Sequence, residues 1–95
     1  MNLARVTGTV VATQKEPSMV GTKFLLLERL SEKLEPKGDF VVAVDAVGAG
    51  EGEVVLYASG SSARQTTVTK DRPADAVVMA IVDSFSIGND VVFRK

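Results

Sequence analysis

The sequence predicts a β-rich single domain, on the strength of its valine content and its short apolar runs. Sixteen of the 95 residues are valine and only three are proline, and β-branched residues favour strands. The apolar residues form short runs between glycine, proline and polar clusters, which is typical of strands. A chain this short buries only about 60 to 65% of the surface that its unfolded form exposes. We therefore expect one domain, residues 1–95, to which association with other copies adds stability.

The first expected strand runs from Leu3 to Thr13, where side chains alternate between two faces. One face carries Ala4, Val6, Val10 and Ala12, and the other carries Arg5, Thr7, Thr9 and Val11. Gly8 interrupts the apolar face, which predicts a bulge or a bend. A loop is expected from Gln14 to Thr22, because it contains Pro17 and Gly21.

The segment from Phe24 to Leu34 is ambiguous between helix and strand. Its leucines, glutamates and lysine are good helix formers, and their spacing is compatible with a helical period. The four residues Pro36, Lys37, Gly38 and Asp39 follow, and their composition predicts a turn that leads into the next strand.

The centre of the chain, Phe40 to Leu56, is predicted to be a strand, a glycine loop and a second strand. Two β-branched runs flank a segment with glycine at Gly48, Gly50 and Gly52, which suggests a sharp turn or a close approach to a neighbouring surface. A phosphate cradle is the functional alternative. Such a loop opens a helix, whereas the chain after Gly52 reads as a strand, and the carboxylates of Glu51 and Glu53 would repel phosphate. A structural or interface loop is the better interpretation.

The last third of the chain predicts two further strands. A serine in Gly60 to Arg64 can cap a short helical turn, and Thr66 to Pro73 is expected to be a loop. Ala76 to Val82 is apolar throughout, so we expect one face in the core and the other against a neighbouring subunit. In Ser84 to Lys95 a Gly-Asn-Asp turn precedes a short strand that can be swapped or disordered.

The absence of two residue types excludes several kinds of catalytic and metal-binding site. Without histidine or cysteine, catalytic triads, thiol nucleophiles and His- or thiolate-bound metals are excluded, so no cofactor or metal is expected. A net charge of −1 and a pI near 5.3 give no field that attracts nucleic acid. No apolar run could span a membrane and no signal peptide is recognisable, so we expect a cytosolic protein.

Some residues admit two interpretations. Asp45 and Asp83 each end an apolar run and could act together as general acid and base, although such aspartates more often accept hydrogen bonds in loops. Arg64 could hold an anion or a neighbouring carboxylate with two hydrogen bonds, or lie in solvent. The five aromatic residues could stack on bases, but basic residues are not interleaved with them, and we expect most of them in the core. They are Phe24, Phe40, Tyr57, Phe85 and Phe93.

Three blocks of the sequence resemble the pentameric vertex proteins of bacterial microcompartments, the family of EutN and CcmL. The blocks are GTVVATQKEPSMVGTKFLLLE (Gly8 to Glu28), AVDAVGAGEGEVVLYASGSSAR (Ala43 to Arg64) and ADAVVMAIVD (Ala74 to Asp83). The middle block is the most specific. The resemblance implies a five-stranded barrel like the OB fold, with Phe24 to Leu30 as a strand. It also implies a homopentamer that caps the corners of a shell built mainly from hexameric proteins.

The resemblance also assigns residues to assembly. Asp45, Gly48, Ala49, Gly50, Gly52 and Glu53 match the family's glycine loop, and Gly60, Ser61, Ser62, Ala63 and Arg64 match a short helical segment near subunit contacts.

The expected function is thus structural and non-enzymatic, in the microcompartment shell of a bacterial cytoplasm. The expected partners are the chain itself and hexameric shell proteins, without nucleic acid or membrane. Two alternatives remain: an OB-fold module that binds single-stranded nucleic acid or oligosaccharide, and a small hydrolase that uses Asp45 and Asp83.

Overall fold

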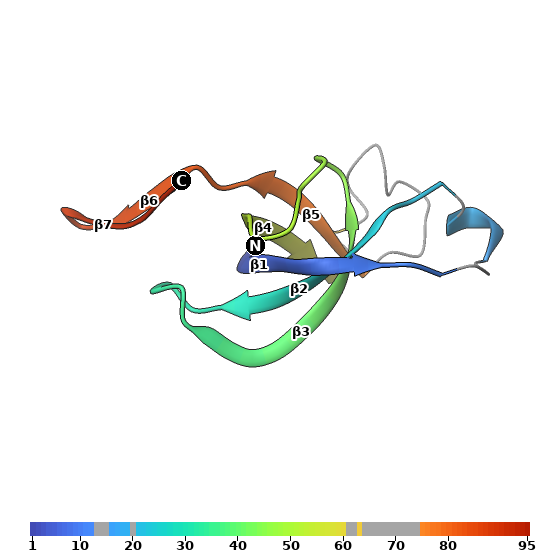
Figure 1. Cartoon of the computed structure of the whole chain (residues 1–95), viewed down its shortest axis with the longest axis horizontal. Helices are drawn as coiled ribbons and strands as arrows, with labels where there is room; N and C mark the ends of the chain where they lie inside the picture. Colours follow the sequence, from blue (N-terminus) through green and yellow to red (C-terminus); the bar gives the residue numbers. More distant parts are fainter. Residues whose placement is uncertain (13–15, 20, 61–62, 64–74) are drawn as a thin grey trace.

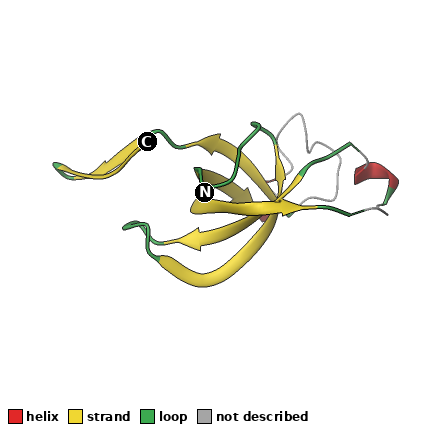
Figure 2. Cartoon of the chain, viewed as in Figure 1, coloured by secondary structure: helices red, strands yellow, loops and turns green. Residues whose placement is uncertain are grey.

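Five strands close into a barrel from which a two-stranded hairpin extends (Figures 1 and 2). The computed structural model describes residues 1–12, 16–19, 21–60, 63 and 75–95. The strand order around the barrel is β1-β2-β3-β5-β4. The barrel strands are β1 (Asn2–Val10), β2 (Phe24–Leu30), β3 (Pro36–Asp45), β4 (Val54–Ser59) and β5 (Ala76–Ile81). The hairpin consists of β6 (Ser84–Ile87) and β7 (Asp90–Arg94). The expected β-rich barrel is confirmed.

Helical structure is minor in the described part of the chain. A 3-10 turn, η1 (Pro17–Met19), lies in the loop expected between the first two strands. Gly60 and Ala63, the described residues of the predicted helical turn after β4, also have 3-10 conformation. None of the described helices is long and apolar enough to cross a membrane.

The first strand has the alternation and the irregularity that its sequence predicts. Ala4 and Val6 are buried in the barrel, while β1 pairs with β2 on one side and with β4 on the other. The register with β2 shifts between Val6 and Gly8, so the expected bulge is confirmed. The strand ends at Val10, earlier than predicted, and the side chain of Val11 is 85% exposed.

The ambiguous segment is a strand from Phe24 to Leu30. Leu25 and Leu27 are fully buried in the core, whereas the alternate residues Phe24, Leu26 and Glu28 are half-buried. β2 is hydrogen-bonded to β1 along one edge and to β3 along the other. This pairing on two sides outweighs the helix propensity of the leucines, because propensity differences amount to only a few tenths of a kcal/mol per residue.

The turn between β2 and β3 lies earlier than predicted, so the prediction of a turn at Pro36 to Asp39 is wrong. The Ser31 hydroxyl accepts hydrogen bonds from the backbone N–H groups of Lys33 and Glu35, both at 3.2 Å, and Leu34 adopts a φ of 63°. The serine oxygen therefore forms the turn. Pro36 is instead the first residue of β3, opposite Leu30, a position where a strand tolerates proline.

Apolar side chains form two clusters. The cluster inside the barrel contains Ala4, Val6, Leu25, Leu27, Ala43, Ala49, Val55, Tyr57, Ala76 and Val78. The second cluster contains Val44, Ala58, Ala63 and Val77, with Met19, Phe24, Ala46 and Met79 packed against it. Since side chains alternate along β5, this second cluster lies on the outer face of that strand.

At Val77 the outer face of β5 is covered by the chain itself. Val77 is fully buried against Ala58 and Ala63 without any second copy. The prediction that this face of Ala76 to Val82 meets a neighbouring subunit is wrong for Val77. The apolar pattern correctly indicated burial on two sides, but the sequence could not tell which segment provides the outer cover.

Candidate assembly site

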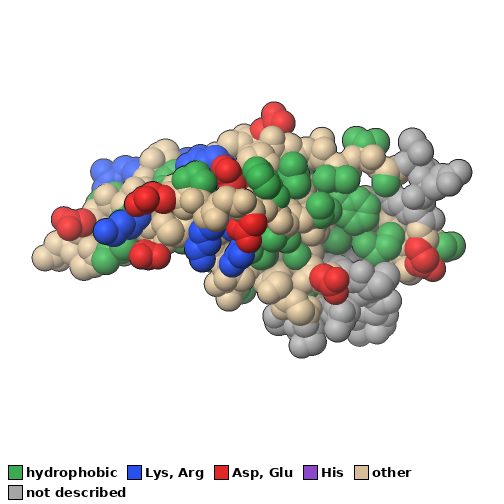
Figure 3. All heavy atoms as spheres, turned by 90° about the horizontal axis from the view of Figure 1, so that it is seen from below, with side chains coloured by type: hydrophobic (Ala, Val, Ile, Leu, Met, Phe, Trp, Pro, Cys, Tyr) green, Lys and Arg blue, Asp and Glu red, His purple; other side chains and the backbone are tan. Residues whose placement is uncertain are grey.

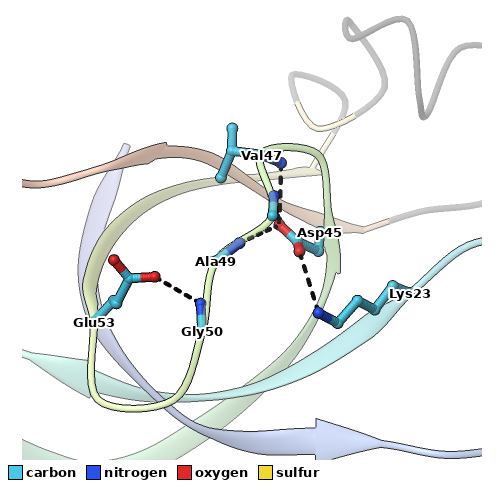
Figure 4. Close-up of polar contacts among 7 residues, drawn as sticks. Lys23, Asp45, Val47, Ala49, Gly50 and Glu53 are labelled. Atoms are coloured by element: carbon cyan, nitrogen blue, oxygen red, sulfur yellow. Dashed lines mark hydrogen bonds and ion pairs between the residues drawn. The ribbon is translucent and has the colours of Figure 1, made fainter.

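The glycine loop between β3 and β4 is fastened by one carboxylate. Asp45, the last residue of β3, has a side chain that is only 2% exposed. Its Oδ1 atom accepts hydrogen bonds from the backbone N–H groups of Val47, Gly48 and Ala49, at 3.1, 3.0 and 3.3 Å (Figure 4). Asp45 is thus a loop-capping acceptor, one of the two roles that the sequence left open.

Lys23 supports this carboxylate from the adjacent strand end. Its ammonium Nζ lies 4.0 Å from Oδ2 of Asp45, and its backbone carbonyl accepts the N–H of Asp45 at 2.8 Å. The lysine side chain is 56% exposed, so the ion pair itself contributes little stability. The three amide donors are the stronger restraint on the carboxylate.

Two of the three glycines in the loop have a backbone conformation that other residues rarely adopt. Gly48 has a φ of 77° and Gly52 a φ of 85°, whereas Gly50 does not lie in the left-handed region. Ala49, between the first two glycines, is buried in the cluster inside the barrel. The turn at Gly48 thus directs a methyl group into the barrel, and the loop becomes part of the core packing.

The end of the loop is bonded to the first strand. The N–H of Gly52 donates to the carbonyl of Val6 at 2.8 Å, and the N–H of Val6 donates to the carbonyl of Glu53 at 2.9 Å. Arg5 adds a guanidinium hydrogen bond to the carbonyl of Gly52 at 2.8 Å. The two backbone hydrogen bonds of Val6 continue the β1–β4 ladder into the loop. They fix the loop against the barrel.

Glu53 connects the loop to the hairpin. Its Oε1 accepts the N–H of Gly50 at 2.7 Å, and its Oε2 accepts the ammonium of Lys95 at 2.7 Å. The lysine first and the amide second lower the pKa of the Glu53 carboxyl below its ordinary value, and the same contact raises the pKa of Lys95. No local pattern indicated this partner, because the two residues are 42 positions apart in the chain.

The second predicted assembly segment is only partly described. Gly60 donates its N–H to the carbonyl of Asp75 at 2.8 Å, and Ala63 is fully buried in the outer cluster. Ser61, Ser62 and Arg64 lie outside the described residues, so the roles predicted for them stay predictions.

The arrangement argues against the catalytic and nucleotide-binding alternatives. The amides that a phosphate cradle would need already donate to Asp45. Asp45 lies opposite Val78 on β5, and Asp83 follows five residues later, roughly 16 Å along an extended chain. The two carboxylates are therefore not brought together. Among the described residues, no three acidic side chains gather as metal ligands.

The aromatic residues do not form a single platform. Tyr57 alone among the five is fully buried, so the prediction that most are in the core is wrong. Phe40 is 55% exposed on β3, Phe24 packs in the outer cluster, and Phe85 and Phe93 stack on each other in the hairpin. Rings on separate elements do not offer successive bases a stacking surface.

Comparison with known proteins identifies the family. The family model described as "Ethanolamine utilisation protein EutN/carboxysome" matches residues 1–83. The chain is 50% identical to the carboxysome shell vertex protein CcmL of Gloeobacter violaceus, over 100% of this chain and 95% of that protein. It is 51% identical to the bacterial microcompartment shell vertex protein GrpN of Rhodospirillum rubrum, over 94% of this chain and all of GrpN.

Solved structures agree with the sequence comparison. The structure of Gloeobacter violaceus CcmL matches with a TM-score of 0.96 and 50% identity, covering 100% of this chain and 98% of that one. The structure of GrpN, described as a pentameric microcompartment shell protein from Rhodospirillum rubrum, matches with a TM-score of 0.84 and 49% identity, covering 92% of this chain and 99% of GrpN. The chain therefore belongs to the EutN/CcmL family, whose members CcmL and GrpN are shell vertex proteins.

Proposed function

We propose that this chain forms homopentameric vertices that close a bacterial microcompartment shell in the cytoplasm. The observation that carries the proposal is the 50% identity to a carboxysome shell vertex protein over the whole chain, with a TM-score of 0.96 to a solved CcmL. The pentameric GrpN structure supports the same oligomeric state. At this level of identity we expect this chain to share the barrel and the contacts between subunits with these relatives.

The work of such a pentamer is geometric. A flat layer of hexamers has no curvature, and a closed polyhedron needs fivefold units at its corners. A ring of five copies provides that unit, and the proposed neighbours are hexameric shell proteins. Each contact around the vertex is repeated, so that modest single contacts add up to a stable joint.

The glycine loop is proposed to give the ring a rigid contact surface. The amides of the loop are occupied within the chain by Asp45 and Glu53, while Val47 at its tip is 40% exposed. A rigid loop loses little conformational entropy when a second surface covers it. The residues assigned to this role remain Asp45, Gly48, Ala49, Gly50, Gly52 and Glu53, together with Gly60 to Arg64.

A non-enzymatic role agrees with the chemistry of the chain. The chain has no histidine and no cysteine, and the buried carboxylate of Asp45 is used to cap the loop. A general acid or base must reach a substrate proton. Asp45 instead holds three amides of its own chain, so we propose no catalysis and no nucleic-acid binding.

Electron microscopy of shells tests the proposed function. Shell hexamers are produced with and without this chain in the same cells. Without it we expect open sheets, tubes or elongated bodies, and with it compact closed particles. A folded barrel that cannot form rings serves as the control and should leave the shells open. Sealed polyhedra of the same size in both samples would show that the chain is not the vertex.

A further inference from the structure

The hairpin β6–β7 is joined to the barrel at two points. The N–H of Val82, just before the hairpin, donates to the carbonyl of Val54 at 2.8 Å, and the ammonium of Lys95, at the other end, contacts Glu53 at 2.7 Å. Among the described residues, the strands β6 and β7 pair with each other and make almost no contact with the barrel strands. They extend away from the barrel (Figure 1). The direction of the hairpin therefore depends on the two points at its base.

Lys95 closes this base. Its backbone N–H donates to the carbonyl of Asp83 at 2.7 Å, so Lys95 lies opposite the residue at which the hairpin begins. Without the ammonium contact, the described part of the chain would hold the hairpin only at Val82, through the backbone and one hydrogen bond of that residue. Attachment at a single residue leaves the direction of a hairpin free, whereas two separate points define it.

The surrounding charges do not replace the contact of Lys95. Seen from below, basic and acidic side chains are interspersed at the end of the molecule that carries the hairpin, whereas hydrophobic side chains gather over the barrel (Figure 3). Interspersed charges of both signs largely cancel in their long-range field, and salt screens exposed charges beyond about 8 Å. A contact as short as 2.7 Å is therefore better suited to orient the hairpin.

Glu53 holds the hairpin and the glycine loop with the same carboxylate. Its Oε1 accepts the N–H of Gly50 (Figure 4), while its Oε2 accepts the ammonium of Lys95. The glutamate side chain is 24% exposed and the lysine side chain 50% exposed, so each has rotamer freedom to lose when it is held. Because both oxygens belong to one rigid group, the rotamer that meets Lys95 is also the rotamer that binds Gly50.

We propose that Lys95 is a positioning residue that acts through the Glu53 carboxylate and couples the direction of the hairpin to the order of the glycine loop. A molecule that fixes either element then favours order in the other, because coupling between two sites is reciprocal. The coupling itself is a property of the single chain. Its consequence for assembly rests on the proposed function: in a vertex, a contact made by the hairpin would also order the loop that carries the predicted assembly residues.

Solvent exchange of the Gly50 amide, measured by NMR, tests the coupling. Lys95→Met removes the charge and keeps a long side chain. We expect the Gly50 amide to exchange about two- to fivefold faster in this variant, as the loss of one exposed ion pair allows. Lys95→Arg can still donate to the carboxylate and should keep the wild-type rate. Arg94→Met is the matched control, since it removes an exposed neighbouring charge of the same sign and should leave Gly50 unchanged.

Two other amides separate the coupling from a general loosening of the chain. The N–H of Ala49 donates to Asp45 rather than to Glu53, so its exchange should stay at the wild-type rate in every variant. The N–H of Val82 reports on the base of the hairpin and should exchange faster in Lys95→Met. Salt at about 1 M screens exposed charges. Relative to Ala49, it should accelerate Gly50 in the wild type but not in Lys95→Met.

Three results would overturn the coupling. They are an unchanged Gly50 rate in Lys95→Met, an equal change in Arg94→Met, and a rise of the Ala49 rate together with that of Gly50. Light scattering on the same samples keeps the proposed function separate. A wild-type chain that forms no ring would refute the vertex, while the exchange rates of that chain would still decide whether Lys95 positions the hairpin through Glu53.

Discussion

Asp45 illustrates how a single side chain decides between two functions that the same sequence motif permits. A glycine-rich loop with free amides binds anions, but here a carboxylate from the same chain takes three of those amides. The charge is held on a side chain that is 2% exposed. Because these three amides are occupied, they cannot bind an anion, and the loop can contact a neighbouring molecule only through its shape.

The glycines of the loop should differ in their tolerance of substitution. Gly48→Ala and Gly52→Ala should each lower the free energy of unfolding by about 1 to 2 kcal/mol, because an L-residue is strained at positive φ. Gly50→Ala should change it by less than about 0.5 kcal/mol, because a Cβ there would lie 3.5 Å from Oε1 of Glu53, an ordinary contact. Urea unfolding at one fixed protein concentration measures all three.

Glu51→Ala is the control for these substitutions. The side chain of Glu51 is exposed in the same loop, so the free energy of unfolding of this variant should stay at the wild-type value. Equal losses at Gly48, Gly50 and Gly52 would mean that the left-handed conformation is not what the loop requires.

The contact between hairpin and barrel should respond to pH at both ends of the scale. Because the pKa of Glu53 is lowered, the contact stabilises the fold above the unfolded carboxyl pKa and is lost as the pH falls through the folded value. Because the pKa of Lys95 is raised, the contribution is complete below the ordinary lysine pKa and is lost as the pH rises through the folded value. Between these two pH limits the Lys95–Glu53 contact should hold the base of the hairpin against the barrel.

An NMR titration of the Glu53 carboxyl checks this assignment. Lys95→Met should move its pKa part of the way back toward the ordinary value, since the Gly50 amide still donates to it. Arg94→Met removes a neighbouring charge of the same sign and should leave the Glu53 titration in place. An unchanged Glu53 pKa in Lys95→Met, or equal shifts in both variants, would contradict the contact.

The assembled protein should be a closed ring of fixed size. Five chains of 10.0 kDa give about 50 kDa, and light scattering should return that mass over a wide range of dilution, because each copy in a ring is held by two joints. The single-chain species should appear only at low concentration, without intermediate even-numbered forms. A stable monomer, a dimer or a hexamer at working concentrations would count against the vertex assignment.

The sequence by itself determined the β-rich class, the bulge at Gly8, the loop at Gly48 to Gly52 and, through its motifs, the family. These features depend on local chemistry: β-branched runs, alternation of faces, and a glycine where the strand must bend. The tertiary structure decided the rest, because it depends on which distant segments meet. Strand pairing on two sides made a strand of Phe24 to Leu30, and the chain's own Ala58 and Ala63 covered Val77. The contact of Lys95 with Glu53 joins side chains 42 residues apart, and no local pattern encodes a pairing over that distance.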